Sequence, residues 1–187
     1  RIGVNAGNSI ESGGNYNVVV GDEAGTAITT GDFNVALGYV ALDANTTASE
    51  NIAIGGFALG ANILGSKSTA VGSGALAVQN YATATDGLNV AVGYASGTAV
   101  TTGVQNTLIG GLAGDAITTG YYNTALGKDA LGTNTLSSLN VAIGHSALKT
   151  MSAGDAETHN VAVGASAGLS VTTSTQNTLI GGLAGAN

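Results

Sequence analysis

Residues 140–148, Asn-Val-Ala-Ile-Gly-His-Ser-Ala-Leu, decide the fold, because variants of this stretch recur along the whole chain. Each copy places a glycine after a large aliphatic residue, and most of these ladder glycines lie 17 residues apart. The ladder glycines are Gly3, Gly21, Gly38, Gly55, Gly72, Gly93, Gly110, Gly127, Gly144, Gly164 and Gly181. A short fixed period is typical of solenoids, in which each repeat contacts only its neighbours. The sequence therefore predicts a single repeat domain over residues 1–187, with about eleven coils of mostly 17 residues.

The five residues that end at each ladder glycine are expected to form a strand. The residue before the glycine is Ile, Leu or Val in every copy, so we expect this position in the core. The residue two before the glycine is usually Ala, and its side chain must point to the opposite face of the strand. Since both faces are apolar, both are predicted to be buried, the Ala face against sister copies in a homotrimer. The predicted fold class is all-β, a parallel β-roll or β-solenoid.

Two further positions predict how the coil interior is filled. Asn lies four residues before the ladder glycine in nine of ten copies, where its amide suits a turn and would stack as an amide ladder. The fourth residue after the glycine is either Gly or Leu. Where it is Gly, a branched residue such as Ile117 follows three residues later; where it is Leu, that later position is Asn, Gln or Met. We infer that one interior volume is filled from either of two places.

Two repeats are longer than the others. We expect their extra residues to bulge as surface loops, around Gln79 to Asp86 and around Met151 to Glu157. Insertions on a solenoid usually emerge on one face, which is often the binding face.

Composition limits the partners of the chain. Charged residues make up only 8% of the sequence and the net charge is −7, so we predict no nucleic-acid partner and expect other chains to cover part of the surface. No cysteine is present, and no apolar run is long enough to span a bilayer, so direct membrane insertion is not expected. The chain begins and stops inside repeats that lack polar caps, which predicts an interior fragment of a longer fibre protein.

The repeat resembles those of two kinds of fibrous protein. Asn140 to Ala147 resembles the head repeat of trimeric autotransporter adhesins, the YadA-like left-handed parallel β-roll. Asn123 to Leu131 is equally similar to repeats in bacteriophage tail-fibre proteins. The resemblance covers nearly the whole chain and implies an extracellular homotrimeric rod, on a cell surface or a virion, that serves attachment. Adhesin heads usually have a shorter period, and neither a neck, a stalk nor an anchor is found in these residues, so both settings stay open.

Aromatic side chains that should point outward are the candidate contact residues. Tyr16, Phe33 and Tyr122 lie five residues before a ladder glycine, Tyr39 and Tyr94 lie one residue after it, and Tyr81 lies in a long coil. Aromatic surfaces suit contact with a cell-surface glycan or protein receptor. We predict no catalytic, cofactor-binding or metal site.

Two alternatives to an attachment fibre remain. Thr pairs such as Thr101-Thr102 recur eight and nine residues after the glycine, as in an ice-binding β-solenoid, although other residues replace them at 63–64 and 152–153. Residues 143–148 fit one hexapeptide of a left-handed β-helix acyltransferase, which would use His145 or His159, but that fold needs a period of 18. We interpret both histidines as surface residues and expect no enzyme activity.

Overall fold

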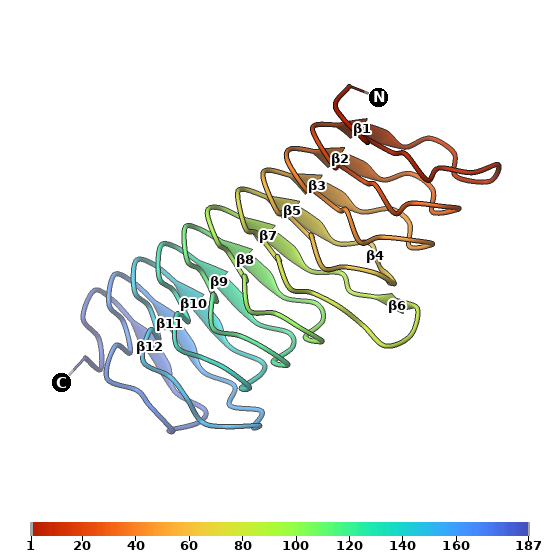
Figure 1. Ribbon diagram of the computed structural model, residues 1–187. Helices are drawn as coiled ribbons and strands as arrows, with labels where there is room; N and C mark the ends of the chain where they lie inside the picture. Colours follow the sequence, from red (N-terminus) through yellow and green to blue (C-terminus); the bar gives the residue numbers. More distant parts are fainter. Residues whose placement is uncertain (1, 187) are drawn as a thin grey trace.

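The computed structural model describes residues 2–186 as an elongated stack of coils, with the two ends of the chain at opposite ends of the stack (Figure 1). Ten short parallel strands form one sheet along its length. They are β1 (Val18–Val20), β2 (Val35–Leu37), β3 (Ile52–Ile54), β5 (Thr69–Val71), β7 (Val90–Val92), β8 (Thr107–Ile109), β9 (Thr124–Leu126), β10 (Val141–Ile143), β11 (Val161–Val163) and β12 (Thr178–Ile180). A smaller sheet pairs β4 (Gly65–Ser66) with β6 (Thr85–Asp86). The predicted all-β solenoid is confirmed.

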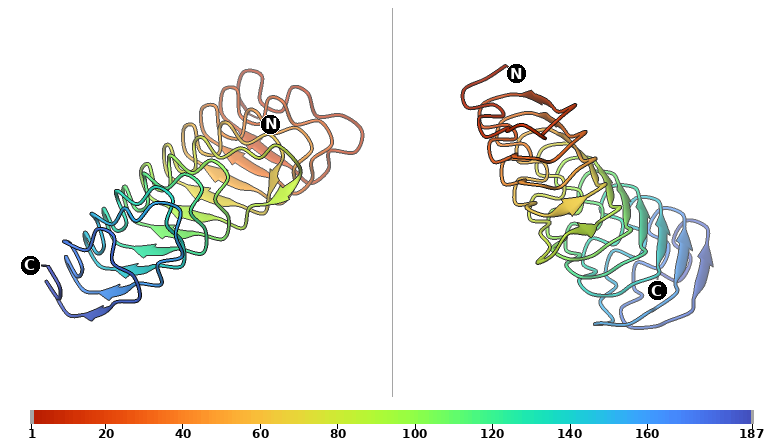
Figure 2. Two further views of the ribbon diagram at one scale, coloured as in Figure 1. Left: turned by 90° about the horizontal axis from the view of Figure 1, so that it is seen from below. Right: turned by 90° about the vertical axis from the view of Figure 1, so that its right-hand side faces the viewer.

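Each strand pairs in register with the same residues of the next coil. Ala36 of β2 lies opposite Ala53 of β3, which lies opposite Ala70 of β5. The incomplete first coil contributes only an isolated bridge between Ile2 and Val20. The chain therefore has eleven ladder glycines but ten strands in the main sheet. The two views in Figure 2 show successive coils stacked along one axis. Residues 2–186 contain no helix, and therefore none that could cross a membrane.

The alanines at the strand centres fill the coil interior, which corrects the prediction that they face sister copies. Ala36, Ala91 and Ala142 are fully buried within their own chain. The aliphatic residues before the ladder glycines point outward instead, and Leu126 is 44% exposed. The reason is the side-chain alternation of a strand: the Asn at the strand entry points inward, so the Ala two residues later also points inward. The expectation that the aliphatic position forms the core is wrong.

The predicted Asn ladder is confirmed, and it is buried. The Oδ1 atom of Asn123 accepts a hydrogen bond from the backbone N–H of Asn140 at 3.1 Å, and its Nδ2 atom donates to the carbonyl of Ser137 at 3.0 Å. The same pair of bonds recurs at Asn34, Asn51 and Asn106. The left-handed backbone conformation belongs to the preceding residue and not to the Asn, because φ is 55° at Tyr122.

The predicted exchange between Leu and Gly is also confirmed. Leu42 and Leu131 are fully buried, as are Ile28 and Ile117 in coils that carry Gly instead. A Cβ atom on Gly25 would lie 2.8 Å from Cδ1 of Ile28, so the two positions share one volume.

A third contributor to this volume was missed from the sequence. A Cβ atom on Gly97 would lie 2.6 Å from Cδ1 of Leu108, which is the central residue of β8. Large strand centres such as Leu108 therefore use the space that Gly leaves, and two neighbouring coils share it.

The ladder glycines have a backbone conformation that only glycine adopts readily. Gly110 has a φ of 133°, and a Cβ atom there would lie 2.6 Å from the carbonyl oxygen of Gly127 in the next coil. The coils approach so closely at this position that no side chain fits between them.

The two long coils bulge less than predicted. Residues 82–84 are exposed and lead into β6, but Gln79 and Met151 at the starts of the expected loops are fully buried. Both occupy the position that Asn45 and Asn134 hold in Leu-containing coils of 17 residues. The additional residues of each long coil therefore follow Gln79 or Met151, whose side chains point into the coil.

Candidate functional site: the outer sheet face and the corner ridge

The outer sheet face consists of the first and third side chains of the ten strands of the main sheet. None of these side chains is charged, and none is fully buried in the single chain. They are Val18, Val20, Val35, Leu37, Ile52, Ile54, Thr69, Val71, Val90, Val92, Thr107, Ile109, Thr124, Leu126, Val141, Ile143, Val161, Val163, Thr178 and Ile180. Long uncharged apolar surfaces mark interaction sites. This face is consequently the strongest candidate for an interface.

The corner ridge lies directly beside the outer sheet face. It consists of the residue five before each ladder glycine, and it comprises Tyr16, Phe33, Glu50, Lys67, Leu88, Gln105, Tyr122, Leu139, His159 and Gln176. Every ridge residue has a φ between 51° and 63°. Nine of the ten are exposed, and Leu139 is half-buried. The backbone turns at this ridge immediately before it enters the strand.

Three of the candidate aromatic residues belong to the corner ridge. The rings of Tyr16 and Phe33 stack on each other at 4.7 Å with an interplanar angle of 12°. Tyr122 meets the ring of Tyr121 edge to face at 5.3 Å. All three candidates, Tyr16, Phe33 and Tyr122, are more than half exposed, as expected. The stacking covers one face of each ring, and Tyr16 still leaves 77% of its surface exposed.

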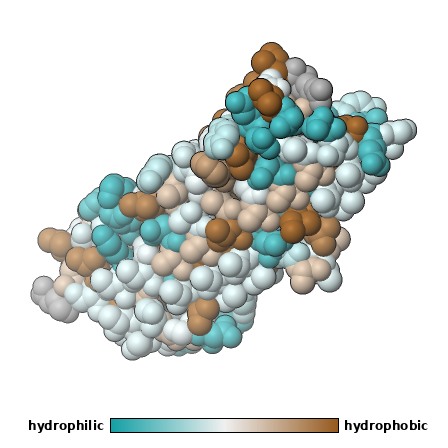
Figure 3. All heavy atoms as spheres, in the orientation of Figure 1, coloured by the Kyte–Doolittle hydropathy of each residue, from teal (hydrophilic) through white to brown (hydrophobic). Residues whose placement is uncertain are grey.

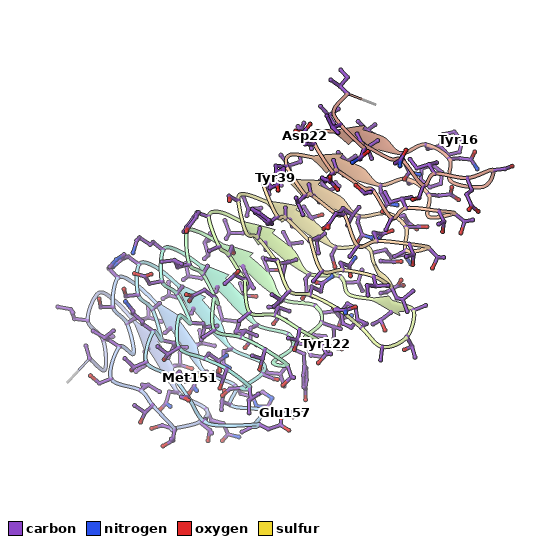
Figure 4. All side chains as sticks on the ribbon, viewed as in Figure 1. Tyr16, Asp22, Tyr39, Tyr122, Met151 and Glu157 are labelled. Carbon is purple, nitrogen blue, oxygen red and sulfur yellow. The ribbon has the colours of Figure 1, made fainter. Side chains whose placement is uncertain are left out.

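Tyr39 and Tyr94 lie at the other end of the strands. Their side chains are 56% and 68% exposed, again as expected. Tyr39 makes an edge contact at 5.4 Å with Phe57, an exposed ring of the next coil that the sequence analysis did not select. Figure 4 shows Tyr16 and Tyr122 along one edge of the stack and Tyr39 along the opposite edge. The exposed aromatic residues therefore form two separate lines, one on each side of the sheet.

Tyr81 is not a surface residue, and this part of the predicted contact set is wrong. Its side chain is 6% exposed, and its hydroxyl donates to the carbonyl of Gly103 at 3.0 Å and accepts from Nδ2 of Asn89 at 3.1 Å. A Cβ atom on either Gly65 or Gly87 would lie 2.8 Å from Tyr81, so both glycines make room for it. Burial raises the pKa of Tyr81 to about 12. Tyr81 anchors the long coil from inside.

Neither histidine lies in a pocket. His145 and His159 are both exposed, which agrees with their interpretation as surface residues. They occupy opposite edges of the sheet, one residue after and five residues before a ladder glycine. Residues 2–186 enclose no pocket and hold no group of three or more side chains arranged to bind a metal.

The Thr pairs divide their side chains between two roles. The hydroxyls of Thr29 and Thr101 each donate to a backbone carbonyl of the next coil at 3.2 Å. The second residue of each pair, such as Thr30 or Thr102, is exposed. In four of the five pairs the first residue therefore contributes to coil stacking and only the second is exposed, whereas Thr172 and Thr173 are both exposed.

The three lysines form ion pairs with nearby carboxylates. Asp129 accepts from Lys128 at 2.6 Å and from Lys149 at 3.5 Å, and the hydrogen bond from Lys128 is the main reason that its pKa is lowered. Burial raises the pKa of Asp43 and of Asp115. Figure 3 shows the resulting surface, mostly pale with separate apolar and polar clusters.

Comparison with known proteins finds no matching family model, no similar curated protein and no similar solved structure. The outer sheet face, the corner ridge and the exposed aromatic residues are the features of the chain that bear on its function.

Proposed function

We propose that this chain is a segment of an attachment fibre that spaces or presents receptor-binding surfaces as a homotrimeric rod. The observation that carries the proposal is the outer sheet face, which is uncharged through all ten strands. A sister copy has the same axial repeat and can cover this face coil by coil. A compact partner would cover only a few coils and leave the rest exposed. The rod has no enzymatic role in this proposal.

The face that packs against sister copies is the Val, Ile and Leu face. This replaces the alanine face of the sequence-based prediction, because those alanines are buried inside each coil. Apolar area of this kind contributes about 25 cal/mol for each Å² removed from water. The resemblance to trimeric adhesin heads and tail fibres supports threefold symmetry, left-handed winding and a location on a cell surface or virion.

Tyr39, Phe57 and Tyr94 are the proposed receptor contacts. They lie on the edge of the sheet opposite the corner ridge and are at least half exposed. Exposed aromatic rings stack on sugar rings and anchor protein contacts, and their low conformational freedom limits the entropy lost on binding.

Purified rods tested on a glycan array and on a panel of bacterial and animal cells would show whether the rod binds a receptor. We expect binding that falls at least tenfold in the Tyr39→Ala/Tyr94→Ala variant. The matched control is Thr30→Ala/Thr119→Ala, which changes two exposed side chains elsewhere on the coils. Equal binding by both variants would remove the aromatic contacts from the proposal. Absence of binding by the unmodified rod would reduce its role to that of a spacer.

A further inference from the structure

We propose that the rings of Tyr39 and Phe57 bind a positively charged segment of a protein partner, through the arginine or lysine side chains of that segment. The inference rests on the proposed function for the role of the two rings as receptor contacts, and it adds the chemistry of the receptor. The surface concerned, which we call the ring edge, consists of the two rings and the carboxylates of Asp22, Glu23 and Asp43.

The two rings offer an open aromatic surface. Tyr39 is 56% exposed and Phe57 is 50% exposed, and their edge contact at 5.4 Å has an interplanar angle of 90°. The space beside them is free of side chains, because a Cβ atom on Gly56 would come no closer than 3.8 Å to its nearest neighbour, the carbonyl of Tyr39. Cations are attracted to the face of an aromatic ring, and here such a face is accessible.

The carboxylates lie next to these rings. Asp22 holds the same position in its coil as Tyr39 does in the following one, the two coils are hydrogen-bonded at this turn, and Figure 4 shows both side chains along one edge of the stack. A Cβ atom on Gly60 would lie 3.4 Å from Oδ1 of Asp43 and 3.4 Å from the carbonyl oxygen of Phe57. The carboxylate of Asp43 therefore borders the turn that carries the second ring.

No positive charge of the described residues balances these carboxylates. Asp22 and Glu23 each accept a hydrogen bond from a neutral amide of the first coil, at 3.0 and 3.2 Å. Residues 2–66 contain no Lys, Arg or His. Burial raises the pKa of the Asp43 carboxyl, and the negative charge of Glu23 raises it further. A cation at the ring edge would relieve this repulsion as well as contact the rings.

The combination of rings and carboxylates selects the partner. An arginine guanidinium can stack on a ring and pair with a carboxylate through the same planar group, and a lysine ammonium can also interact with both. An amino sugar offers an ammonium group without the planar stacking surface, and a sialylated or sulfated glycan would be repelled. A basic protein segment is therefore the occupant that the ring edge suits best.

The probe for the test is a synthetic peptide of alternating glycine and arginine. Its control peptide carries citrulline, a neutral residue of nearly the same shape, in place of each arginine. Fluorescence anisotropy measures the Kd of each peptide for the rod. The ring-edge variant is Asp22→Asn/Glu23→Gln/Asp43→Asn, which removes three charges and keeps the oxygen atoms that accept hydrogen bonds.

The matched control variant is Glu11→Gln/Asp32→Asn/Glu50→Gln, which removes the three other carboxylates of residues 2–66. We expect the unmodified rod to bind the arginine peptide about tenfold more tightly than the citrulline peptide. The ring-edge variant should lose about tenfold in affinity for the arginine peptide, and the control variant no more than about threefold. Circular dichroism melts verify that both variants fold. Equal losses in both variants would show general attraction to an acidic chain and would overturn the inference.

Three further results separate this inference from its alternatives and from the proposed function. Tyr39→Ala/Phe57→Ala should also weaken the arginine peptide, and unchanged affinity would overturn the inference. Tighter binding of glucosamine oligomers than of the arginine peptide would replace the protein partner with an amino glycan and so overturn it. Cell binding that falls in Tyr39→Ala/Tyr94→Ala but not in the ring-edge variant would likewise overturn it, while the proposed receptor contacts would stand.

Discussion

At the scale of single residues, backbone geometry and buried amides hold successive coils in register. Most ladder Asn residues, such as Asn106, join their own coil to the next through Oδ1 and donate from Nδ2 to a carbonyl of the neighbouring turn. Buried amides are costly unless paired, so a shift of one residue would leave every Asn in the column unsatisfied. The ladder glycines reinforce this register, because the chains approach too closely there for any side chain.

Gly110→Ala should therefore destabilise the rod by about 2–4 kcal/mol. The substitution puts a Cβ atom 2.6 Å from the backbone of Gly127 and forces alanine into a φ of 133°. Gly111→Ala is the matched control, since a Cβ atom there comes no closer than 4.0 Å to its nearest neighbour, the carbonyl of Tyr94. We expect the control to lie within about 0.5 kcal/mol of the unmodified chain in urea unfolding. Similar effects of both changes would contradict the close approach.

The buried hydroxyl of Tyr81 predicts a pH dependence. Its pKa in the folded chain is about 12, above the ordinary value of 10.0, because burial disfavours the phenolate. The folded chain thus binds this proton more tightly, so its stabilising contribution is complete below pH 10 and is lost between pH 10 and 12. Tyr81→Phe should be less stable than the unmodified chain at pH 8, because two hydrogen bonds are lost, and should lose less stability between pH 9 and 11. Parallel urea titrations in which both proteins lose stability equally would contradict this.

At the scale of one coil, a constant interior volume is divided among several positions. Three kinds of side chain can fill the same space. They are Leu at the fourth position after the ladder glycine, a branched residue three positions later, and a large residue at the strand centre. Gly at the fourth position suits both the left-handed backbone and the empty volume, whereas Leu there must compensate for its φ by burial. In the Leu42 coil both atoms of the buried Asn45 amide lack a hydrogen-bond partner among the described residues, whereas Asn62 and Asn134 at the same position bond the backbone.

Exchange of the two arrangements in a single coil tests this interpretation. Leu42→Gly alone should destabilise the rod by about 2–4 kcal/mol, because it leaves a cavity. Addition of Asn45→Ile should recover at least half of that loss, since Ile fills the volume as Ile28 does and removes an unpaired amide. Urea unfolding of the single and double variants measures the recovery. A double variant less stable than Leu42→Gly would show that the two positions do not share one space.

At the scale of the whole molecule, a single chain leaves one long face of its sheet unpacked. A sheet is ordinarily covered on both faces when both are apolar, and here the coil interior covers only one. The uncharged outer sheet face is the surface that the proposed association with sister copies would cover.

Charge placed on the outer sheet face should therefore convert the assembly to monomers. Val92→Lys/Ile109→Lys puts two cations on adjacent strands, β7 and β8, where burial against another chain would be costly. Both side chains are partly exposed in the single chain, so the isolated coil should keep its fold by circular dichroism. We expect a concentration-dependent melting temperature for the unmodified chain and a concentration-independent one for this variant. Unchanged assembly of the variant would move the interface elsewhere.

The sequence by itself determined the solenoid, the register, the Asn ladder and the exchange between Leu and Gly. These features repeat in every coil, and the regular spacing of Gly, Asn and Leu records them directly. It also located five of the six aromatic candidates on the surface, because their columns contain variable residues.

Only the tertiary structure decided which strand face lies inside and where Tyr81 points. Both faces of Asn-Val-Ala-Ile-Gly are apolar, so hydrophobicity alone cannot distinguish them. The inward Asn sets the alternation and brings Ala142 into the coil while Val141 and Ile143 face outward. Tyr81 is buried because Gly65 and Gly87, far apart in sequence but adjacent in the stack, leave space for its ring. The burial of Tyr81 depends on contacts between coils, and the sequence pattern of a single repeat does not record such contacts.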